Sequence, residues 1–300
     1  MRVLITGSQG QLGSAISKRL QSRHRTLAVS KKELNITDFD AVLQLIDSFK
    51  PNLTINCAAF TDVEKAEKFP ELAKLVNSTG TQNLALAAKI KNSFLIHFST
   101  DYVFDGQKGS GYTETDRVSP LNKYGLSKAI GDMQLLENFS NFLIFRVAWV
   151  YGPGGNNFPS KILSAALKNE TLKVVDDQNG TPTSTEFISE CVSKIILKHD
   201  LYQIGQDAPV INLVPNGHCN WHEFAKLILF EAKNLGLNLR CGVSAVSPVK
   251  SHQTHYTAQR PKNVVLDNSM AQKLFGFKFA HWSEYAKQYI GSYVREQDAL

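Results

Sequence analysis

Several common features are missing from this 300-residue sequence. No apolar run is long enough to cross a membrane, and the best candidate, "NFLIFRVAWVYG", is interrupted by Arg146. The amino-terminal "MRVLITGSQG" has no signal-peptide core or small-residue cleavage site. The four cysteines are widely spaced without a CxxC pair, so disulfides are not implied. We expect a cytoplasmic protein that has reduced thiols and no membrane partner.

Internal repeats, low-complexity segments and a basic stripe are also missing. The net charge is +6, but the 33 basic residues are scattered and are not interleaved with aromatic residues. This distribution argues against nucleic acid and favours a small phosphorylated ligand. The hydrophobic fraction of 43% and the charged fraction of 20% are typical of a soluble globular protein with one large domain or two ordinary ones.

The first half of the sequence alternates short apolar runs with helical patterns. Runs that are continuously apolar indicate strands buried on both faces, and their alternation with helices predicts βαβ units. The predicted fold class is therefore α/β, with a Rossmann-like doubly wound parallel sheet. The expected strands lie at 2–6, 26–29, 53–59, 94–100 and 142–148, and the expected helices at 11–20, 38–49, in a long stretch ending near 89, and from 120 onwards.

The texture of the sequence changes after residue 151, where "GPGGNNF" and "DDQNGTPTST" are rich in turn-forming residues. We expect residues 1–150 to form the Rossmann domain and 151–300 a smaller α/β domain for the substrate, which can be interleaved with the first at the sheet edge. Helical patterns in this half lie at 158–168, 186–198, 221–235, 268–275 and 282–294.

A glycine-rich turn, "TGSQGQLG", follows the first predicted strand and opens the first predicted helix. Gly7 allows a tight turn, Gly10 lets the backbone approach a pyrophosphate, and Gly13 lets the helix pack closely on the strand. Phosphate would then lie at the positive end of the helix. This context favours a dinucleotide site over a plain turn, although the spacing is GxxGxxG and not GxGxxG.

The residues after the second strand indicate which dinucleotide binds. An acid there would hold the ribose hydroxyl of NAD, whereas basic residues accommodate the 2′-phosphate of NADP. Here the strand runs into Ser30, Lys31 and Lys32, with no acid before Glu33. The sequence therefore favours NADPH, and NADH stays open because the lysines also fit a solvated loop.

A tyrosine and a lysine lie one helical turn apart in "PLNKYGLSK". Ser119 and Pro120 predict the start of this helix. A ketone that accepts a hydride must also receive a proton, and Tyr124 could donate it if Lys128 lowers the pKa of its phenol. Thr100, at the end of the strand "FLIHFST", would hydrogen-bond the carbonyl oxygen and orient it.

This order of glycine turn, strand-end hydroxyl and Tyr-x-x-x-Lys resembles the extended short-chain dehydrogenase/reductase superfamily. Further motifs look like the dTDP-4-dehydrorhamnose reductase family over nearly the full chain. The resemblance implies reduction of the 4-keto group of dTDP-6-deoxy-L-lyxo-4-hexulose (dTDP-4-dehydro-6-deoxy-L-mannose) by NADPH or NADH, giving dTDP-L-rhamnose. The motifs are "NCAAFTDVEKAE" (56–67), "STDYVFDG" (99–106), "PLNKYGLSK" (120–128), "FRVAWVYGPGGNNF" (145–158), "DDQNGTPT" (176–183) and "RPKNVVLD" (260–267).

The resemblance also implies roles for individual residues. Thr100 and Asp101 would touch the sugar, and Lys128 would bind the nicotinamide ribose as well as tune Tyr124. Trp149 would wall the sugar pocket, with a core aromatic as the alternative. Arg260 would pair with the substrate diphosphate, with a surface ion pair as the alternative. The expected cofactor contacts are Gly10, Gln11 and Leu12 at the pyrophosphate and Ala59, Phe60 and Thr61 near the nicotinamide.

Two further interpretations and one metal question stay open. The chain could be another nucleotide-sugar 4-ketoreductase, or a non-catalytic regulatory subunit like that of methionine adenosyltransferase, which resembles this family. Family members can pair through a magnesium site that uses an acid early in the first helix, but this helix has Ala15 and no acid, so we predict no metal. We expect a monomer or a homodimer.

Overall fold

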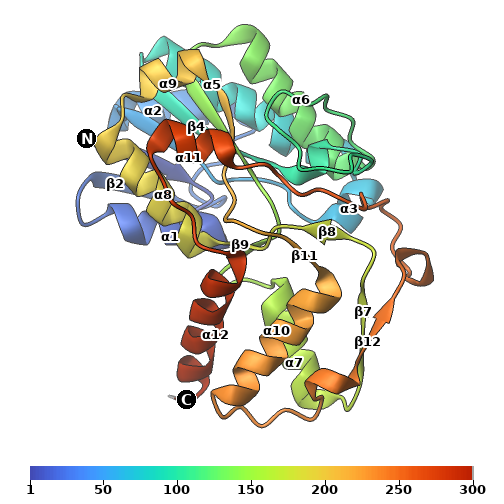
Figure 1. The fold of residues 1–300 in the computed structure, drawn as a ribbon. Helices are drawn as coiled ribbons and strands as arrows, with labels where there is room; N and C mark the ends of the chain where they lie inside the picture. Colours follow the sequence, from blue (N-terminus) through green and yellow to red (C-terminus); the bar gives the residue numbers. More distant parts are fainter. Residues whose placement is uncertain (299–300) are drawn as a thin grey trace.

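A parallel sheet forms the centre of the larger lobe. The computed structural model describes residues 1–298, and the sheet has six strands in the order β2-β1-β3-β4-β5-β10 (Figure 1). All five strand pairings are parallel, so the prediction of a doubly wound sheet is confirmed. The strands are β1 (Arg2–Thr6), β2 (Arg25–Val29), β3 (Leu53–Asn56), β4 (Phe94–Thr100), β5 (Phe142–Val147) and β10 (Val210–Asn212).

Helices cover both faces of this sheet, because side chains alternate between the faces along each strand. Val3 and Ile5 pack with one layer of helices, whereas Leu4, which lies between them, packs with the other. The first layer contains α1 (Gln11–Leu20), α8 (Thr185–Lys198), α9 (Leu201–Asp207) and α11 (Ser269–Phe275), and the second contains α2 (Phe39–Phe49), α5 (Gly80–Ile90) and α6 (Lys123–Asn138).

The smaller lobe is built around a second apolar core, below the sheet in Figure 1. Its helices are α7 (Phe158–Lys168), α10 (Trp221–Asn234) and α12 (Trp282–Asp298), beside the parallel pair β7 (Leu172–Val175) and β12 (Val246–Val249). Short pairs join β6 (Val150–Tyr151) to β9 (Thr183–Ser184) and β8 (Asn179–Gly180) to β11 (Cys219–Asn220). Within residues 1–298 there are also three 3₁₀ turns: η2 (Asp101–Val103), η3 (Val243–Ala245) and η4 (Ser251–Gln253). Because α8, β10 and α11 return to the larger lobe, residues after 151 contribute to both lobes.

Four details differ from the sequence predictions, the first being that β3 ends at Asn56 and not at residue 59. Helix α6 begins at Lys123, three residues after Pro120, because the side chain of Asn122 accepts the Gly125 N–H and caps the helix in place of Ser119. The long helix ending near 89 is divided into α3 (Val63–Lys68), α4 (Pro70–Lys74), the π-helical turn η1 (Leu75–Thr79) and α5, since Pro70 starts a helix more readily than it continues one. Helix α9 was not predicted.

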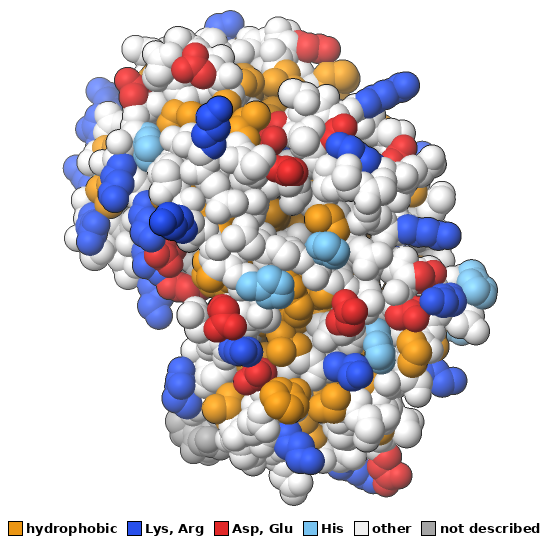
Figure 2. Space-filling model, in the orientation of Figure 1, with side chains coloured by type: hydrophobic (Ala, Val, Ile, Leu, Met, Phe, Trp, Pro, Cys, Tyr) orange, Lys and Arg blue, Asp and Glu red, His pale blue; other side chains and the backbone are white. Residues whose placement is uncertain are grey.

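Charged side chains of both signs are spread over the surface, and the cysteines are unpaired. On the face drawn in Figure 2, basic side chains lie at many separate places with acidic side chains among them. Among the described residues, every helix is too short or too polar to span a bilayer. All four cysteines are free thiols.

Candidate active site

A cavity of about 580 Å³ opens at the carboxyl ends of β1, β3, β4 and β5. In the sheet, β1 lies between β2 and β3, so the order in which the strands are added reverses beside β1. Ligands of doubly wound folds bind in the crevice at such a reversal. A second cavity of about 250 Å³ adjoins it and shares Gln9, Gly10 and Cys57 with it. Among the predicted site residues, the larger cavity is lined by Gly10, Gln11, Leu12, Ala59, Thr61, Thr100, Asp101, Tyr124, Lys128 and Trp149, and the second by Gly7, Gly10, Lys31, Ala59 and Phe60.

The glycine turn brings the backbone close to both cavities. Gly7 has a φ of +68°, and a Cβ atom there would lie 2.7 Å from the Cys57 carbonyl carbon. A Cβ atom at Gly13 would overlap the Gly7 carbonyl, so Gly13 lies beneath the turn and lets α1 pack against it. Gly10 caps α1 without a side-chain hydrogen bond, and the first turn of the helix has no acid. The amino terminus of α1 therefore presents unpaired N–H groups and positive potential to an anion.

The two predicted cofactor residues after β2, Ser30 and Lys31, lie in different surroundings. Lys31 is exposed and lines the second cavity. Ser30 is buried outside the lining of both cavities, and its backbone N–H donates to the Glu33 carboxylate at 2.7 Å. Hydrogen bonds from the backbone and the side chain of Ser30 lower the pKa of Glu33, so the first acid after β2 is already engaged.

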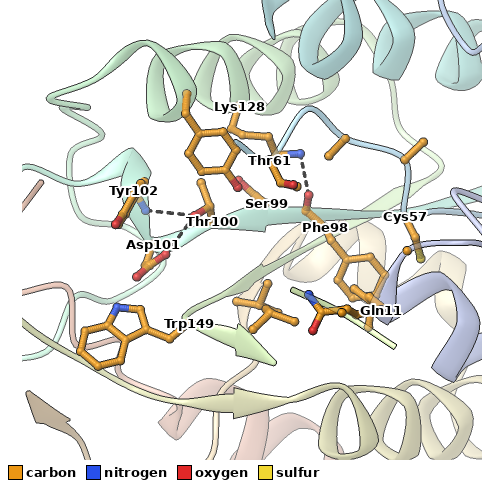
Figure 3. A pocket seen from close by; sticks show the side chains of 18 of the residues that line it. Gln11, Cys57, Thr61, Phe98, Ser99, Thr100, Asp101, Tyr102, Lys128 and Trp149 are labelled. Atoms are coloured by element: carbon orange, nitrogen blue, oxygen red, sulfur yellow. Dashed lines mark hydrogen bonds between the residues drawn. The ribbon is translucent and has the colours of Figure 1, made fainter. Parts of the chain in front are cut away.

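Thr100 and Asp101 form a buried pair at the end of β4. The Thr100 hydroxyl donates to Asp101 Oδ1 at 2.9 Å and accepts the Tyr102 N–H at 3.2 Å (Figure 3). Burial raises the pKa of Asp101 to about 7, although the hydrogen bond from Thr100 acts in the opposite direction. Asp101 Oδ2 has no hydrogen-bond partner among the described residues. The pair thus offers one free oxygen to a ligand in the cavity.

Helix α6 brings Tyr124 and Lys128 to the same cavity. Burial raises the pKa of Tyr124 well above its ordinary value, and the nearby Thr100 hydroxyl lowers it in part. Lys128 is only 2% exposed, and its Nζ donates to the Phe98 carbonyl at 2.7 Å (Figure 3). Burial also lowers the pKa of Lys128 to about 8. The fold therefore places Tyr124, Thr100 and Lys128, the three catalytic residues predicted from the sequence, around one cavity.

A row of polar side chains beneath Lys128 was missed in the sequence. Thr6, Asn56 and His97 are neighbours in the register of β1, β3 and β4. Thr6 Oγ1 lies 2.8 Å from Asn56 Oδ1, and His97 Nε2 lies 2.9 Å from Lys128 Nζ. The available signal was the amide of Asn56 at the end of the run "LTIN" and the imidazole of His97 inside the run "FLIHFST".

Trp149 lies across the cavity from Lys128 in Figure 3. Its indole stacks on Trp221 with ring centroids 3.4 Å apart and planes at 6°. Trp149 has a φ of 44°, an unusual conformation for a large residue. Trp221 is the first residue of α10 and also lines the cavity, and its Nε1 donates to Gln178 at 3.1 Å. Sequence reasoning did not single out Trp221.

Arg260 lies outside the lining of both cavities. Its guanidinium pairs with Glu64 at 3.0 Å and stacks 3.6 Å above the Tyr256 ring. The backbone N–H of Thr257 also donates to Glu64, at 2.9 Å. This ion pair holds the 256–260 segment against the start of α3.

Comparisons with known proteins agree with this geometry. A family model described as RmlD substrate binding domain matches residues 1–295. A dTDP-4-dehydrorhamnose reductase from Aggregatibacter actinomycetemcomitans is 38% identical over 296 residues, which cover 95% of this chain and 97% of that protein. The chain belongs to the dTDP-4-dehydrorhamnose reductase family.

Solved structures of the dTDP-4-dehydrorhamnose reductase family have the same fold. The protein from Clostridium acetobutylicum superposes with a TM-score of 0.87 and is 35% identical, covering 97% of this chain and 98% of that one. The protein from Bacillus anthracis, solved in complex with NADP, has a TM-score of 0.86 and is 33% identical, covering 96% and 98%. The family resemblance and the fold class expected from the sequence are therefore confirmed.

Proposed function

We propose that this protein reduces the 4-keto group of dTDP-4-dehydro-6-deoxy-L-mannose with NADPH and so forms dTDP-L-rhamnose. The observation that carries the proposal is the meeting of Thr100, Tyr124 and Lys128 in one cavity whose rim is the glycine turn. Membership of the dTDP-4-dehydrorhamnose reductase family supplies the substrate class. Fold alone would leave the substrate open, because one scaffold hosts many reactions.

The chain has a fitting place for a dinucleotide. The amino terminus of α1, which has no side-chain cap, suits a pyrophosphate, and Gly7 and Gly13 let the turn before it pack closely against residues 57–58 and against α1. Lys31 suits the extra phosphate of NADPH, since the first acid after β2 is held by Ser30. When bound, the nicotinamide supplies the hydride, and the protein supplies position and a proton.

Tyr124 has the properties of a proton donor for the forming alkoxide. Because burial raises its pKa, the side chain stays a phenol at neutral pH, which is the form that can donate. Thr100 would turn its hydroxyl from Asp101 to the substrate carbonyl and so orient it. The free oxygen of Asp101 would then accept a sugar hydroxyl.

The remaining predicted contacts lie at the edge of the cavity. The Trp149–Trp221 stack offers an apolar wall for the sugar nucleotide. Arg260 reaches the substrate diphosphate only if the phosphate takes the place of Glu64, which now neutralises the guanidinium. A guanidinium fork binds phosphate well, so this exchange is chemically reasonable.

The test is oxidation of NADPH followed at 340 nm with dTDP-4-dehydro-6-deoxy-L-mannose. We expect turnover by the wild type and a loss of roughly 10² to 10⁴ in kcat for Tyr124→Phe, the range for loss of a general acid. Binding of NADPH, measured by fluorescence titration, should survive the substitution. Tyr102→Phe is the matched comparison, since Tyr102 lines the same cavity with its ring centroid 5.8 Å from that of Tyr124.

Two outcomes would contradict the proposal. Equal losses in the two variants would deny Tyr124 its special role. Tight NADPH binding by the wild type without turnover would indicate a different sugar or a regulatory subunit, and a panel of nucleotide sugars would separate these.

A further inference from the structure

The face of the sheet beneath α6 carries three polar side chains. Ser99 on β4 pairs with Arg146 on β5 in the register of these strands, and His97 lies two residues before Ser99. Because side chains two residues apart share a face, and those of paired residues do too, all three point to the same side of the sheet. Helix α6 lies over this side and adds Lys128 and Asp132, which are one turn apart. All five side chains are at most 3% exposed.

The Asp132 carboxylate is hydrogen-bonded at one of its two oxygens. The Ser99 hydroxyl donates to Oδ2 at 2.5 Å. Oδ1 is buried, has no hydrogen-bond partner among the described residues, and lies 3.8 Å from His97 Nε2. The same ring nitrogen lies 2.9 Å from Lys128 Nζ, so the imidazole has the carboxylate and the amine as its neighbours. A buried carboxylate oxygen without a donor is costly unless a positive charge lies nearby.

The charge of Asp132 compensates that of Lys128. Burial lowers the pKa of Lys128 to about 8, and Asp132 acts against burial. Among the described residues no other carboxylate shifts the pKa of Lys128 in this way. His97 does not replace it, because burial lowers the pKa of the imidazole well below its ordinary value and keeps the ring neutral. Tyr124, on the same helix, is also neutral, since burial raises the pKa of its phenol.

Arg146 is a second buried cation beside Asp132, but it has further partners. Its guanidinium donates to the Glu114 carbonyl at 3.1 Å. Asp132 favours its charge, and the carboxylates of Glu114 and Asp116 do so as well. Burial raises the pKa of Asp132, and the attraction of Lys128 and then of Arg146 opposes this. Arg146 therefore shares its compensation among three carboxylates, whereas Lys128 depends on one.

We propose that Asp132 is a positioning residue, the buried counter-ion that keeps Lys128 an ammonium at neutral pH. An ammonium can favour the ionised form of Tyr124, whereas a neutral amine cannot. The consequence for catalysis rests on the proposed function, but the pairing of Asp132 with Lys128 does not.

The first test is the pKa of Lys128, followed by the ¹³Cε shift of labelled lysine and assigned by the signal that is missing in Lys128→Met. Asp132→Asn keeps the shape and removes the charge, so the pKa should fall by about one unit or more. Glu137→Gln is the matched control, because it removes an exposed carboxylate from the same helix and should leave the pKa of Lys128 nearly unchanged. An unchanged pKa in Asp132→Asn, or equal shifts in the two variants, would overturn the proposal.

Urea unfolding at pH 7 gives the second test, which also serves if Asp132→Asn folds poorly. In the wild-type background the substitution leaves the ammonium without its counter-ion, so the urea midpoint should fall. In the Lys128→Met background there is no ammonium, so the same substitution should lower the midpoint much less. Equal falls in the two backgrounds, or failure of the double variant to fold, would mean that Asp132 acts through its hydrogen bond with Ser99 and would refute the pairing.

The third test is the pH dependence of kcat/KM with NADPH and dTDP-4-dehydro-6-deoxy-L-mannose. A fall in the pKa of Lys128 from about 8 to about 7 should make Asp132→Asn less than about twofold slower than the wild type at pH 6.5 and about eightfold slower at pH 8.5. A purely structural role would give the same loss at both pH values. That result would overturn the role in catalysis.

The first two tests need no substrate. If they give the expected results and no nucleotide sugar is reduced, the counter-ion stands and the proposed function fails. If Tyr124→Phe abolishes turnover while Asp132→Asn leaves the pKa of Lys128 unchanged, the proposed function stands and the role of Asp132 falls.

Discussion

Replacing Lys128 by methionine should change how the stability of the protein depends on pH. Burial lowers the pKa of Lys128 from its ordinary 10.5 to about 8, and each unit corresponds to about 1.4 kcal/mol. Between these two pKa values the unfolded chain binds more protons than the folded one, so the stability of the wild type rises with pH through this window. Below pH 8 the buried ammonium costs about 3 kcal/mol.

Urea unfolding of wild type and Lys128→Met at intervals from pH 7 to pH 10 measures this effect. The difference in unfolding free energy should shift by at least about 2 kcal/mol in favour of the wild type as the pH rises. Methionine also leaves the Phe98 carbonyl and His97 without their partner, but that loss is nearly constant with pH. Two parallel curves would show that Lys128 has an ordinary pKa in the folded protein and would refute the reasoning.

Two further substitutions test the walls of the cavity. Lys31→Ala should weaken NADPH binding about three- to tenfold and leave NADH binding unchanged. Lys32 lies outside the cavity lining, so Lys32→Ala should leave the binding of both cofactors unchanged. Equal effects of the two variants in binding titrations would mean that only the overall charge matters. Trp221→Ala removes the stacking partner of Trp149, so KM for the sugar nucleotide should rise about threefold to tenfold with the NADPH affinity unchanged, and a KM equal to that of the wild type would exclude the stack from substrate binding.

The fold was largely predictable because its strands are buried on both faces. The runs at 2–6 and 94–100 are largely apolar and appear as β1 and β4 with these bounds. Helix starts were less certain, because capping depends on which of several polar residues reaches the backbone. Asn122 caps α6 with its oxygen while its amide donates to Gln259, a contact across 137 residues that no local pattern contains.

The candidate site was predictable where the chemistry is local and was missed where it arises from packing. Tyr124 and Lys128 share one helix, so their spacing alone made them neighbours. His97 and Trp221 matter through contacts with residues far away in the sequence, to Lys128 and Trp149 respectively. The partner of Arg260 also comes from a distant segment, since Glu64 opens α3.

The polar row across β1, β3 and β4 ties the surroundings of Lys128 to the assembly of the sheet. A slip of one residue in either pairing would turn Asn56 or His97 to the opposite face of the sheet. Lys128 can therefore pair with His97 only after three strands, separated by 41 and 50 residues at their polar contacts, have docked in register. During refolding, the protection of this single amine from an acylating reagent would mark the moment at which the sheet closes beneath the cavity.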